Sequence, residues 1–381
     1  MARIKPQIET FARIKVVGVG GGGGNAVSRM VQCKIQGVDF VAINADAQDL
    51  NQCQAQEKVL IGKNLTRGLG AGMNPEIGRQ AAEENRDEIH EVVKGADMVF
   101  VTCGLGGGVG SGAAPVVAEA ARDAGALTVG VVTKPFGFEG SQRNRIAEQS
   151  LKNLKEKVDT LITIPNDKIM QTVEKKTSLI DAFAVVDDVL RQAVQGIAEL
   201  ITVPGIVNVD FADVKAIMQN AGSALMGIGR ATGENRAVEA AKLAINSPLL
   251  ELSIDGAKGV LFNISGGPDM AMSEINEAAE VVTESIDKDA KVIFGAVVDN
   301  AFKKGEFKVT VIATGFDTGV QPAAKKTEES KLVKPQVQQP DKPVQPEEKK
   351  SLFNKPFRTH SIEVENDDLL DIPAFIRRKM Q

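Results

Sequence analysis

Residues 101–115 read VTCGLGGGVGSGAAP, and six of the nine residues from 104 to 112 are glycine. An apolar run precedes this stretch and an alanine-rich helical pattern follows it. A Walker-type phosphate loop would close with Gly-Lys-Ser/Thr, whereas this stretch closes with Gly110-Ser111-Gly112 and contains no lysine. We therefore expect a phosphate bound here to be held mostly by backbone N–H groups at the start of a helix.

A second glycine run follows the apolar stretch RIKVVGV of residues 13–19 and opens another helical pattern. Two such runs on adjacent parallel strands can surround a polyphosphate from two sides. Taken alone, Gly18, Gly20 and Gly23 also match the dinucleotide fingerprint, with Asp39 near the spacing of an acidic ribose contact. A nicotinamide-dependent oxidoreductase is therefore an alternative, although no constellation of reactive groups for that chemistry is evident in the second domain.

The composition excludes several classes of protein. Of the 381 residues, 43% are hydrophobic and 25% are charged, and the net charge of -5 argues against a nucleic-acid or anionic-membrane surface. No apolar run reaches the ~18 residues of a membrane span, and the N-terminus MARIKPQIET lacks a signal-peptide core. Three cysteines without metal-ligand spacing favour a reducing cytoplasm. With two histidines, of which His90 is expected on a helix surface, histidine-based catalysis is nearly excluded.

Continuous apolar runs predict strands in the first half of the chain, at residues 13–19, 38–46, 96–104, 126–135 and 159–167. Helical patterns such as 76–93 and 113–125 lie between them. This alternation indicates a parallel sheet that helices cover on both faces. Ligands of such sheets bind at the carboxyl ends of the strands, which is where the glycine and Asn/Asp clusters fall.

The second half of the chain contains a long helix, a second domain and a segment of different composition. Ser178 opens a long helical segment that Pro204-Gly205 ends, and further strands and a helix then indicate a small α+β domain. From Asp317 onward, Pro, Gln, Lys and Glu dominate, which is typical of a disordered linker. The last residues, DDLLDIPAFIRRKMQ, combine apolar side chains at helical spacing with basic ones, as a docking peptide does.

The predicted organisation is thus a nucleotide-binding α/β domain at 11–177, a central helix at 178–204, an α+β domain with an acidic loop at 205–316, a disordered linker at 317–366 and a partner-binding peptide at 367–381.

Seven segments resemble, in order, those of the FtsZ family of bacterial cell-division GTPases, the prokaryotic relatives of tubulin. They are GVGGGGGNAV, NADAQDL, GLGGGVGSGAAP, TKPFGFEG, IPND, NVDFADV and LDIPAF. The resemblance covers residues 10–316 almost without gaps and returns in the last dozen residues. It implies a cytoplasmic GTPase at the division site that binds GTP or GDP, with Mg²⁺ carried by the nucleotide and no separate metal site.

The resemblance also implies partners and contact residues. The chain would polymerise head to tail with itself, and membrane-tethering adaptors and other division proteins would bind residues 367–381, without nucleic-acid binding or direct membrane insertion. The residues that would contact GTP are Gly21, Gly22, Gly23, Gly24, Asn25, Asn44, Asp46, Gly107, Gly108, Val109, Gly110, Glu139, Arg143, Phe183 and Asp187. Asp187 would read guanine, whose N1–H and 2-amino donors one carboxylate can accept together, whereas adenine would leave the acid unpaired.

The glycine runs contain no candidate base for hydrolysis, but an acidic turn, NVDFAD, follows the long helix. About 25 helical residues would place this turn roughly 35 Å from Ser178, beyond reach of the same subunit's nucleotide. The resemblance implies that Asp210 and Asp213, supported by Asn208, act on the nucleotide of the next subunit. A head-to-tail contact that does not close generates a filament. A plain Asp-capped helix start at 213 is a compatible alternative.

Val109 stands where the family usually has threonine, so its side chain offers no hydroxyl to a γ-phosphate, while Ser111 retains the loop's other hydroxyl. A filament or scaffold protein that binds GTP without hydrolysing it is therefore a second alternative.

Overall fold

The computed structural model describes residues 12–170, 177–203, 205–207, 209–247, 254, 256–287, 289–298 and 302–316. The predicted linker, the predicted C-terminal peptide and Asn208 lie outside these residues.

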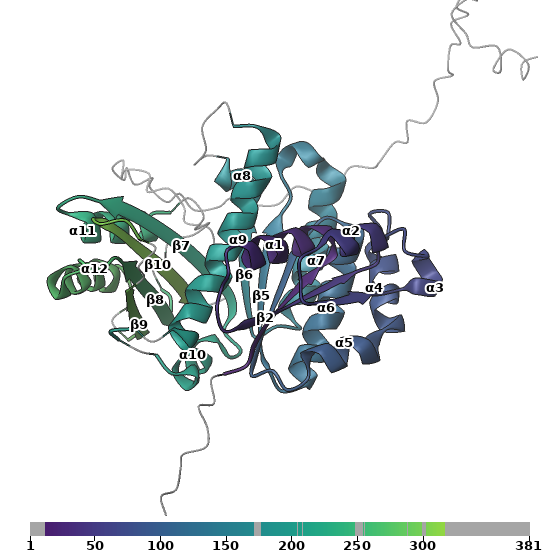
Figure 1. Cartoon of the computed structure of the whole chain (residues 1–381), viewed down its shortest axis with the longest axis horizontal. Coiled ribbons are helices and arrows are strands. Elements are labelled where there is room, and N and C mark those ends of the chain that lie inside the picture. The colour runs from purple at the N-terminus through teal and green to yellow at the C-terminus, as the bar shows by residue number, and fades with distance from the viewer. Residues whose placement is uncertain are drawn as a thin grey trace, which may run out of the picture. The chain divides into compact units, whose positions relative to one another are not determined.

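The strands of the described residues form one ten-stranded sheet in the order β3-β2-β1-β4-β5-β6-β7-β10-β8-β9 (Figure 1). Their bounds are β1 Ile14–Val19, β2 Val38–Asn44, β3 Glu57–Leu60, β4 Met98–Gly104, β5 Leu127–Lys134, β6 Thr160–Pro165, β7 Gly222–Thr232, β8 Gly259–Gly266, β9 Lys291–Val298 and β10 Glu306–Thr314. Strands β1 to β6 pair in parallel throughout. Strand β7 joins β6 in parallel over residues 160–162, and β10 runs antiparallel to both β7 and β8.

The helices are α1 Gly20–Gln32, α2 Ala47–Gln52, α3 Lys63–Thr66, α4 Pro75–Glu84, α5 Arg86–Val93, α6 Gly108–Asp123, α7 Ser141–Lys155, α8 Asn166–Ile169, α9 Leu179–Thr202, α10 Phe211–Met218, α11 Arg236–Ile245 and α12 Met272–Glu284, with a 3-10 turn, η1, at Gly137–Glu139. The predicted fold class, a parallel-sheet α/β domain joined by a long helix to a smaller α+β domain, is confirmed.

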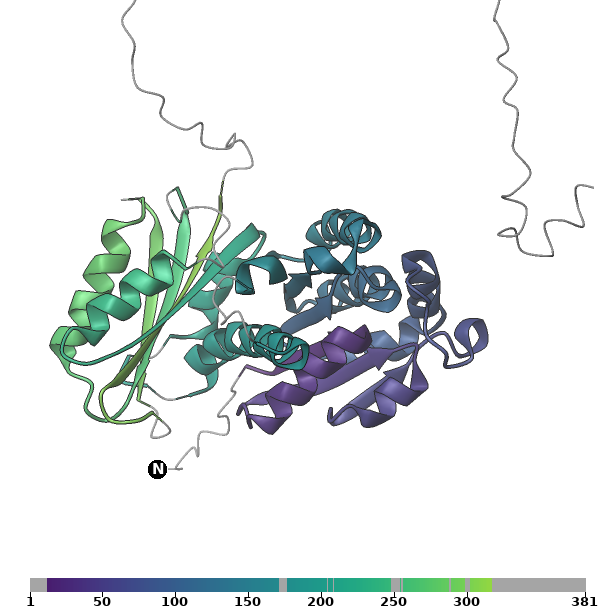
Figure 2. The ribbon, with the colours of Figure 1, turned by 90° about the horizontal axis from the view of Figure 1, so that it is seen from above.

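Helices cover both faces of the parallel part of the sheet, and this explains its continuous apolar strands. Met98 and Phe100 of β4 face the core under α1 and α9, whereas Val99 and Val101 face the core under α4, α5 and α6. A third core lies between the strands β8 and β10 and the helices α11 and α12. Figure 2 shows α9 running between the two halves.

The long helix α9 begins as predicted. The Oγ atom of Ser178, its N-cap, accepts a hydrogen bond from the Asp181 N–H at 3.2 Å. Its 24 residues rise by about 36 Å at 1.5 Å per residue. The helix ends at Thr202, and its buried residues belong to the same core as Ile162 of β6 and Ile312 of β10. The two ends of α9 are therefore held in fixed places in the molecule.

Candidate nucleotide site

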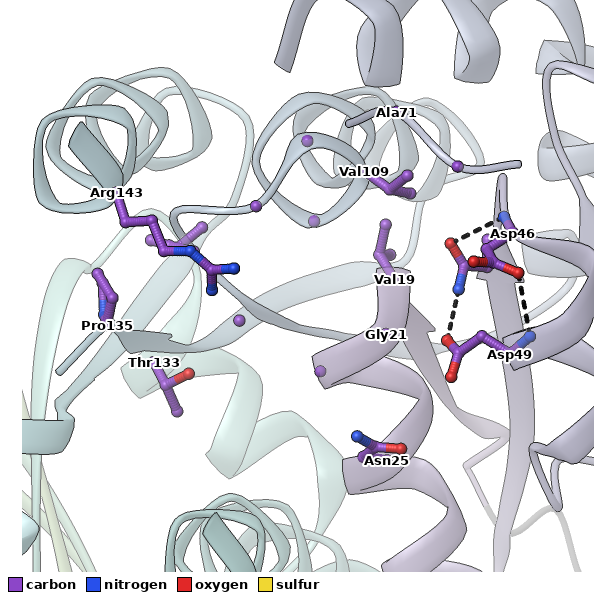
Figure 3. Close-up of a pocket in the computed structure, with 18 of the residues that line it drawn as sticks. Val19, Gly21, Asn25, Asp46, Asp49, Ala71, Val109, Thr133, Pro135 and Arg143 are labelled. Atoms are coloured by element: carbon purple, nitrogen blue, oxygen red, sulfur yellow. Dashed lines mark hydrogen bonds between the residues drawn. The ribbon is translucent and has the colours of Figure 1, made fainter. Parts of the chain in front are cut away.

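A cavity of about 610 Å³ opens at the carboxyl ends of β1, β2, β4, β5 and β6 (Figure 3). Each strand contributes a residue from its end or just beyond it, namely Val19, Asn44, Gly104, Thr133 and Asn166. All the residues predicted to contact GTP line this cavity except Gly23 and Gly24. The fold thus brings together residues that are more than 160 positions apart, from Gly21 to Asp187.

Each glycine run leads into the first turn of a helix, the second one through a short turn at residues 105–107. Helix α1 begins at Gly20 and α6 begins at Gly108. The N–H groups of a first helical turn have no partner within the helix, so both helices direct free donors and the positive ends of their dipoles toward the cavity. This arrangement suits a polyphosphate and requires no lysine.

Not every glycine of these runs serves a ligand. A Cβ atom on Gly23 would lie 2.5 Å from the carbonyl oxygen of Thr102, so Gly23 allows α1 to approach β4 closely. A Cβ atom on Gly112 would lie 1.9 Å from the carbonyl oxygen of Pro75, where α6 crosses α4. By contrast, a Cβ atom on Gly107 would meet nothing within 4 Å, because this residue faces the cavity.

The hydroxyl of Ser111 does not face the cavity. Its Oγ atom accepts a hydrogen bond from the Gly106 N–H at 2.9 Å, and the residue is buried. The loop's other hydroxyl, which Ser111 retains, therefore closes the turn and does not line the cavity. Val109 lines the cavity with Val19 and Ala71, and together they form an apolar wall (Figure 3).

The end of the cavity next to α9 combines aromatic rings with amide and carboxyl groups. Phe183 contacts Phe136 edge to face, with ring centroids 5.3 Å apart. Burial raises the pKa of the Asp187 carboxyl to about 6, against the opposing positive charge of Arg29. The Oδ1 atom of Asn166, a residue that sequence reasoning missed, is buried without a hydrogen-bond partner among the described residues. Such a site can bind a planar base that carries several donors and acceptors.

Two carboxylates and an amide form a network at the α1 end of the cavity (Figure 3). The Asn44 Nδ2 atom donates to Asp49 Oδ2 at 2.7 Å, and Asp46 Oδ1 accepts from the Asp49 N–H at 3.1 Å. Asp46 caps α2 in this way. Burial and the neighbouring charge of Asp46 raise the pKa of Asp49, while the hydrogen bond from Asn44 opposes that rise. Sequence reasoning missed Asp49, although it lies three residues after Asp46 at the start of the same short helix.

An ion pair lies on the remaining wall. The Arg143 Nη1 atom is 2.6 Å from Glu139 Oε2, and the other oxygen of Glu139 accepts from the Phe136 N–H at 3.0 Å. Arg143 is thereby fixed with its guanidinium near the cavity (Figure 3).

The acidic turn lies beyond the opposite end of α9. Phe183 and Asp187 belong to the N-terminal part of that helix, whereas Asp210 and Asp213 follow its C-terminus and do not line the cavity. Both acidic side chains are exposed. Asp210 caps α10, since its Oδ1 atom accepts from the Asp213 N–H at 2.8 Å. The helix therefore starts at Phe211, with Asp210 as its cap, and not, as the alternative placed it, at Asp213.

Residues 13–174 match the model of the Tubulin/FtsZ family, GTPase domain, and residues 222–317 match that of the FtsZ family, C-terminal domain. The chain belongs to the tubulin/FtsZ family. Among solved structures, an empty FtsZ dimer from M. jannaschii is 46% identical, with a TM-score of 0.79 over 86% of this chain and 96% of that one. A point mutant of FtsZ from M. jannaschii is 49% identical, with a TM-score of 0.78 over 81% of this chain and 92% of that one.

A third solved structure is similar at lower sequence identity. CetZ2 from Haloferax volcanii, solved as a GTPγS-bound protofilament, is 25% identical, with a TM-score of 0.68 over 80% of this chain and 94% of that one. Membership of the family argues against the oxidoreductase alternative, and Asp39, which that alternative placed at a ribose, is exposed on β2 and does not line the cavity.

Other features of this tubulin/FtsZ member concern residues outside the cavity. His90 is exposed on α5, as predicted. None of the described helices combines the length and hydrophobicity that a membrane crossing requires. Within the same described ranges, no three His, Cys, Asp or Glu side chains gather as a metal cluster.

Proposed function

We propose that this chain binds GTP in the cavity and hydrolyses it where two copies join head to tail, so that it assembles into filaments. The observation that carries the proposal is the separation of the cavity from Asp210 and Asp213 by the length of α9. A carboxylate can orient or activate a water molecule for attack on a phosphate. Because these carboxylates follow the far end of α9, they serve the nucleotide of a neighbouring copy.

The cavity supports guanine as the base. Asp187 and Asn166 at one end offer acceptors and donors for the guanine edge, and Phe183 offers a ring to pack against it. The N–H groups of the first turns of α1 and α6 hold the phosphates, and Arg143 lies near the ribose and α-phosphate. Of the two glycines that the resemblance also assigned to GTP and that do not line the cavity, Gly23 allows α1 to approach β4 closely.

A cytoplasmic role in the bacterial division ring rests on family membership. The proposed domain organisation is that of residues 11–177, 178–204 and 205–316 described above, followed by the linker at 317–366. Residues 367–381 would bind the membrane-tethering adaptors and other division proteins. Mg²⁺ would accompany the nucleotide.

Light scattering and phosphate release on the purified protein test the proposal directly. We expect GTP to raise scattering, GDP and NAD to leave it flat, and phosphate to be released as filaments form. Filaments without phosphate release would support the scaffold alternative that Val109 suggests. Scattering that GTP does not change would contradict the proposal.

Asp187→Ala is expected to weaken GTP binding by about 1–3 kcal/mol, the range for a lost charge-assisted hydrogen-bond pair. Binding needs the ionised carboxylate, so the GTP affinity of the wild-type protein should fall about tenfold per pH unit below pH of about 6. Asp187→Asn should bind weakly at every pH. Fluorescence titration with a labelled GTP between pH 5 and 8 measures both effects, and equal pH profiles for the wild type and Asp187→Asn would remove Asp187 from the site.

The raised pKa of Asp187 also makes the stability of the nucleotide-free protein depend on pH. Stability falls as the pH rises, whereas GTP affinity increases. Because the pKa of Asp187 in the folded protein lies above the ordinary value of 3.8, the group stabilises the fold fully below pH 3.8. This contribution is lost as the pH rises through about 6. Neutral pH therefore favours nucleotide binding at a small cost in the stability of the empty protein.

Deletion of residues 367–381 is expected to leave GTP-driven assembly intact and to abolish recruitment to membranes that carry an adaptor, because an apolar segment beyond a linker is suited to docking. Co-sedimentation of filaments with adaptor-bearing vesicles measures this recruitment. Loss of assembly in the truncated protein would instead place the segment inside the filament.

A further inference from the structure

Helix α10, Phe211–Met218, carries the acidic turn at its N-terminal end, beyond the C-terminal end of α9 (Figure 1). Asp210 caps this helix, and Asp213 lies in its first turn. The position of the two carboxylates therefore depends on how α10 is held against the rest of the molecule. Packing holds it in part, since Val214 and Met218 belong to the same core as the buried residues of α9.

Hydroxyl groups from two strands hold the C-terminal end of α10. The last carbonyl groups of a helix have no partner within it. Here the Met218 carbonyl oxygen accepts a hydrogen bond from Thr160 Oγ1, at the start of β6. The Thr314 Oγ1 atom, at the end of β10, lies 3.3 Å from the Ile217 carbonyl oxygen and 3.2 Å from that of Gly259. Both threonines are buried, so bulk water would not replace a lost hydroxyl.

A buried carboxylate holds the connection that follows α10. Asp159, the residue before β6, accepts through Oδ1 from the Asn220 N–H at 3.3 Å. Its Oδ2 atom accepts from the Thr128 N–H, in β5, at 2.9 Å. The Asn220 Oδ1 atom accepts in turn from Arg122 Nη2 at 3.0 Å. The chain is therefore tied to the parallel half of the sheet just after α10 ends.

We call Thr160, Thr314 and Asp159 the α10 anchor, and it lies at the opposite end of the helix from the acidic turn. Eight helical residues span about 12 Å, so a rotation of about 5° at the anchor moves Asp210 by about 1 Å. A misplacement of about 1 Å can cost about a hundredfold in rate. Strand β6 also leads from Thr160 directly to Asn166, which lines the nucleotide cavity. One strand thus connects the anchor to the cavity.

We propose that Thr160 is a positioning residue for GTP hydrolysis, because its hydroxyl holds α10 in the orientation that brings the acidic turn to the nucleotide of a neighbouring copy. Thr314 and Asp159 hold the same end of the helix. This inference rests on the proposed function, since it needs the acidic turn to act across a junction between copies. It goes beyond that function by assigning a role in turnover to buried residues that do not line the cavity.

The test compares Thr160→Val, which removes the hydroxyl and keeps the shape of the side chain, with Thr160→Ser, which keeps the hydroxyl. Thr160→Val should bind a fluorescent, non-hydrolysable GTP analogue with wild-type affinity and release phosphate about tenfold more slowly. Thr160→Ser should match the wild type. Thr283→Val, which removes an exposed hydroxyl on α12, is the control for the loss of a threonine hydroxyl and should also match it.

Thermal unfolding checks that each variant is folded. If Thr160→Val does not fold, Thr314→Val takes its place in every assay, because it removes the other hydroxyl at the same end of α10. The same slow phosphate release and unchanged binding of the analogue are expected from it.

Mixing shows which end of the subunit is impaired. Gly107→Trp places a ring in the cavity and keeps its own acidic turn. At a mixed junction that turn would meet the intact cavity of a Thr160→Val chain, so phosphate release should rise on mixing. A mixture of Thr160→Val with Asp210→Ala should show no such rise, because neither chain supplies a working turn. A general loss of stability would not produce this asymmetry.

The outcomes separate the two proposals. Wild-type turnover in a folded Thr160→Val, with Gly107→Trp and Asp210→Ala still rescuing each other, would overturn the role of Thr160 and leave the shared site in place. Weaker binding of the analogue to Thr160→Val, or its rescue by Asp210→Ala, would place the defect in the cavity and would also overturn that role. Absence of rescue between Gly107→Trp and Asp210→Ala would overturn the proposed function and this inference with it.

Discussion

Asp210→Ala is expected to bind GTP with wild-type affinity and to lose most of its GTP hydrolysis. Asp210 does not line the cavity and lies beyond the far end of α9. The loss should therefore appear in turnover and not in binding. Asp210 also caps α10, so its removal costs about 1 kcal/mol of stability. Asp210→Ser restores a capping oxygen without the carboxylate, and should be stable but equally inactive.

Mixing two inactive variants tests whether the hydrolytic site is shared between two subunits or complete within one. Gly107→Trp should block the cavity without disturbing the fold, because a side chain at this position enters open space. Neither Gly107→Trp nor Asp210→Ala alone should turn over GTP well. A mixture forms junctions in which the intact cavity of an Asp210→Ala chain meets the intact acidic turn of a Gly107→Trp chain, so partial rescue is expected.

Phosphate release over a range of protein concentrations supplies the second measurement for this prediction. Turnover per subunit should rise with concentration, because isolated subunits lack a complete site. Strict proportionality of rate to concentration, combined with no rescue on mixing, would show a self-contained active site and exclude the proposed head-to-tail mechanism.

Gly112→Ala is expected to destabilise the nucleotide-binding half by about 3 kcal/mol or more, because the added methyl group would lie 1.9 Å from the Pro75 carbonyl oxygen. The Pro75 carbonyl group belongs to the backbone and cannot rotate away from the methyl group as a side chain could. The helices α4 and α6 would therefore have to move apart. Gly107→Ala is the matched control from the same glycine run, and its methyl group meets nothing within 4 Å.

Thermal unfolding measures the difference between these two glycines. We expect a fall in Tm of about 6–12 °C for Gly112→Ala, at about 2–4 °C per kcal/mol for a domain of this size. Gly107→Ala should keep a Tm within a few degrees of the wild type and should weaken GTP binding instead. Equal Tm values for the two variants would show that α4 and α6 do not depend on Gly112 for their packing.

The sequence predicted the parallel half of the fold because its strands are buried on both faces and are therefore continuously apolar, as in residues 98–101 of β4. It did not reveal β7, Gly222–Thr232, whose buried, half-buried and exposed residues follow no regular period and include three glycines. Nor did it reveal the four-residue β3, which is too short to show a period.

The candidate site was predictable to a similar extent. Residues within recognisable motifs were found, and the rule that ligands bind at carboxyl ends of strands located the cavity. That rule also covers Asn166 and Thr133, which were missed because single polar residues at strand ends carry no spacing signal. Which glycines serve packing and which contact a ligand depends on which helix crosses α6. The order of residues in the sequence does not show which helices cross.

The placement of the cavity and the acidic turn at opposite ends of α9 gives a filament of the proposed kind two unlike tips. At one tip, the last subunit holds a nucleotide that no neighbour covers. Under the proposed mechanism, that nucleotide would stay intact until another subunit binds. Each junction behind it would begin to hydrolyse its GTP when the junction forms. The share of GDP would therefore be greatest at the oldest junctions of the filament.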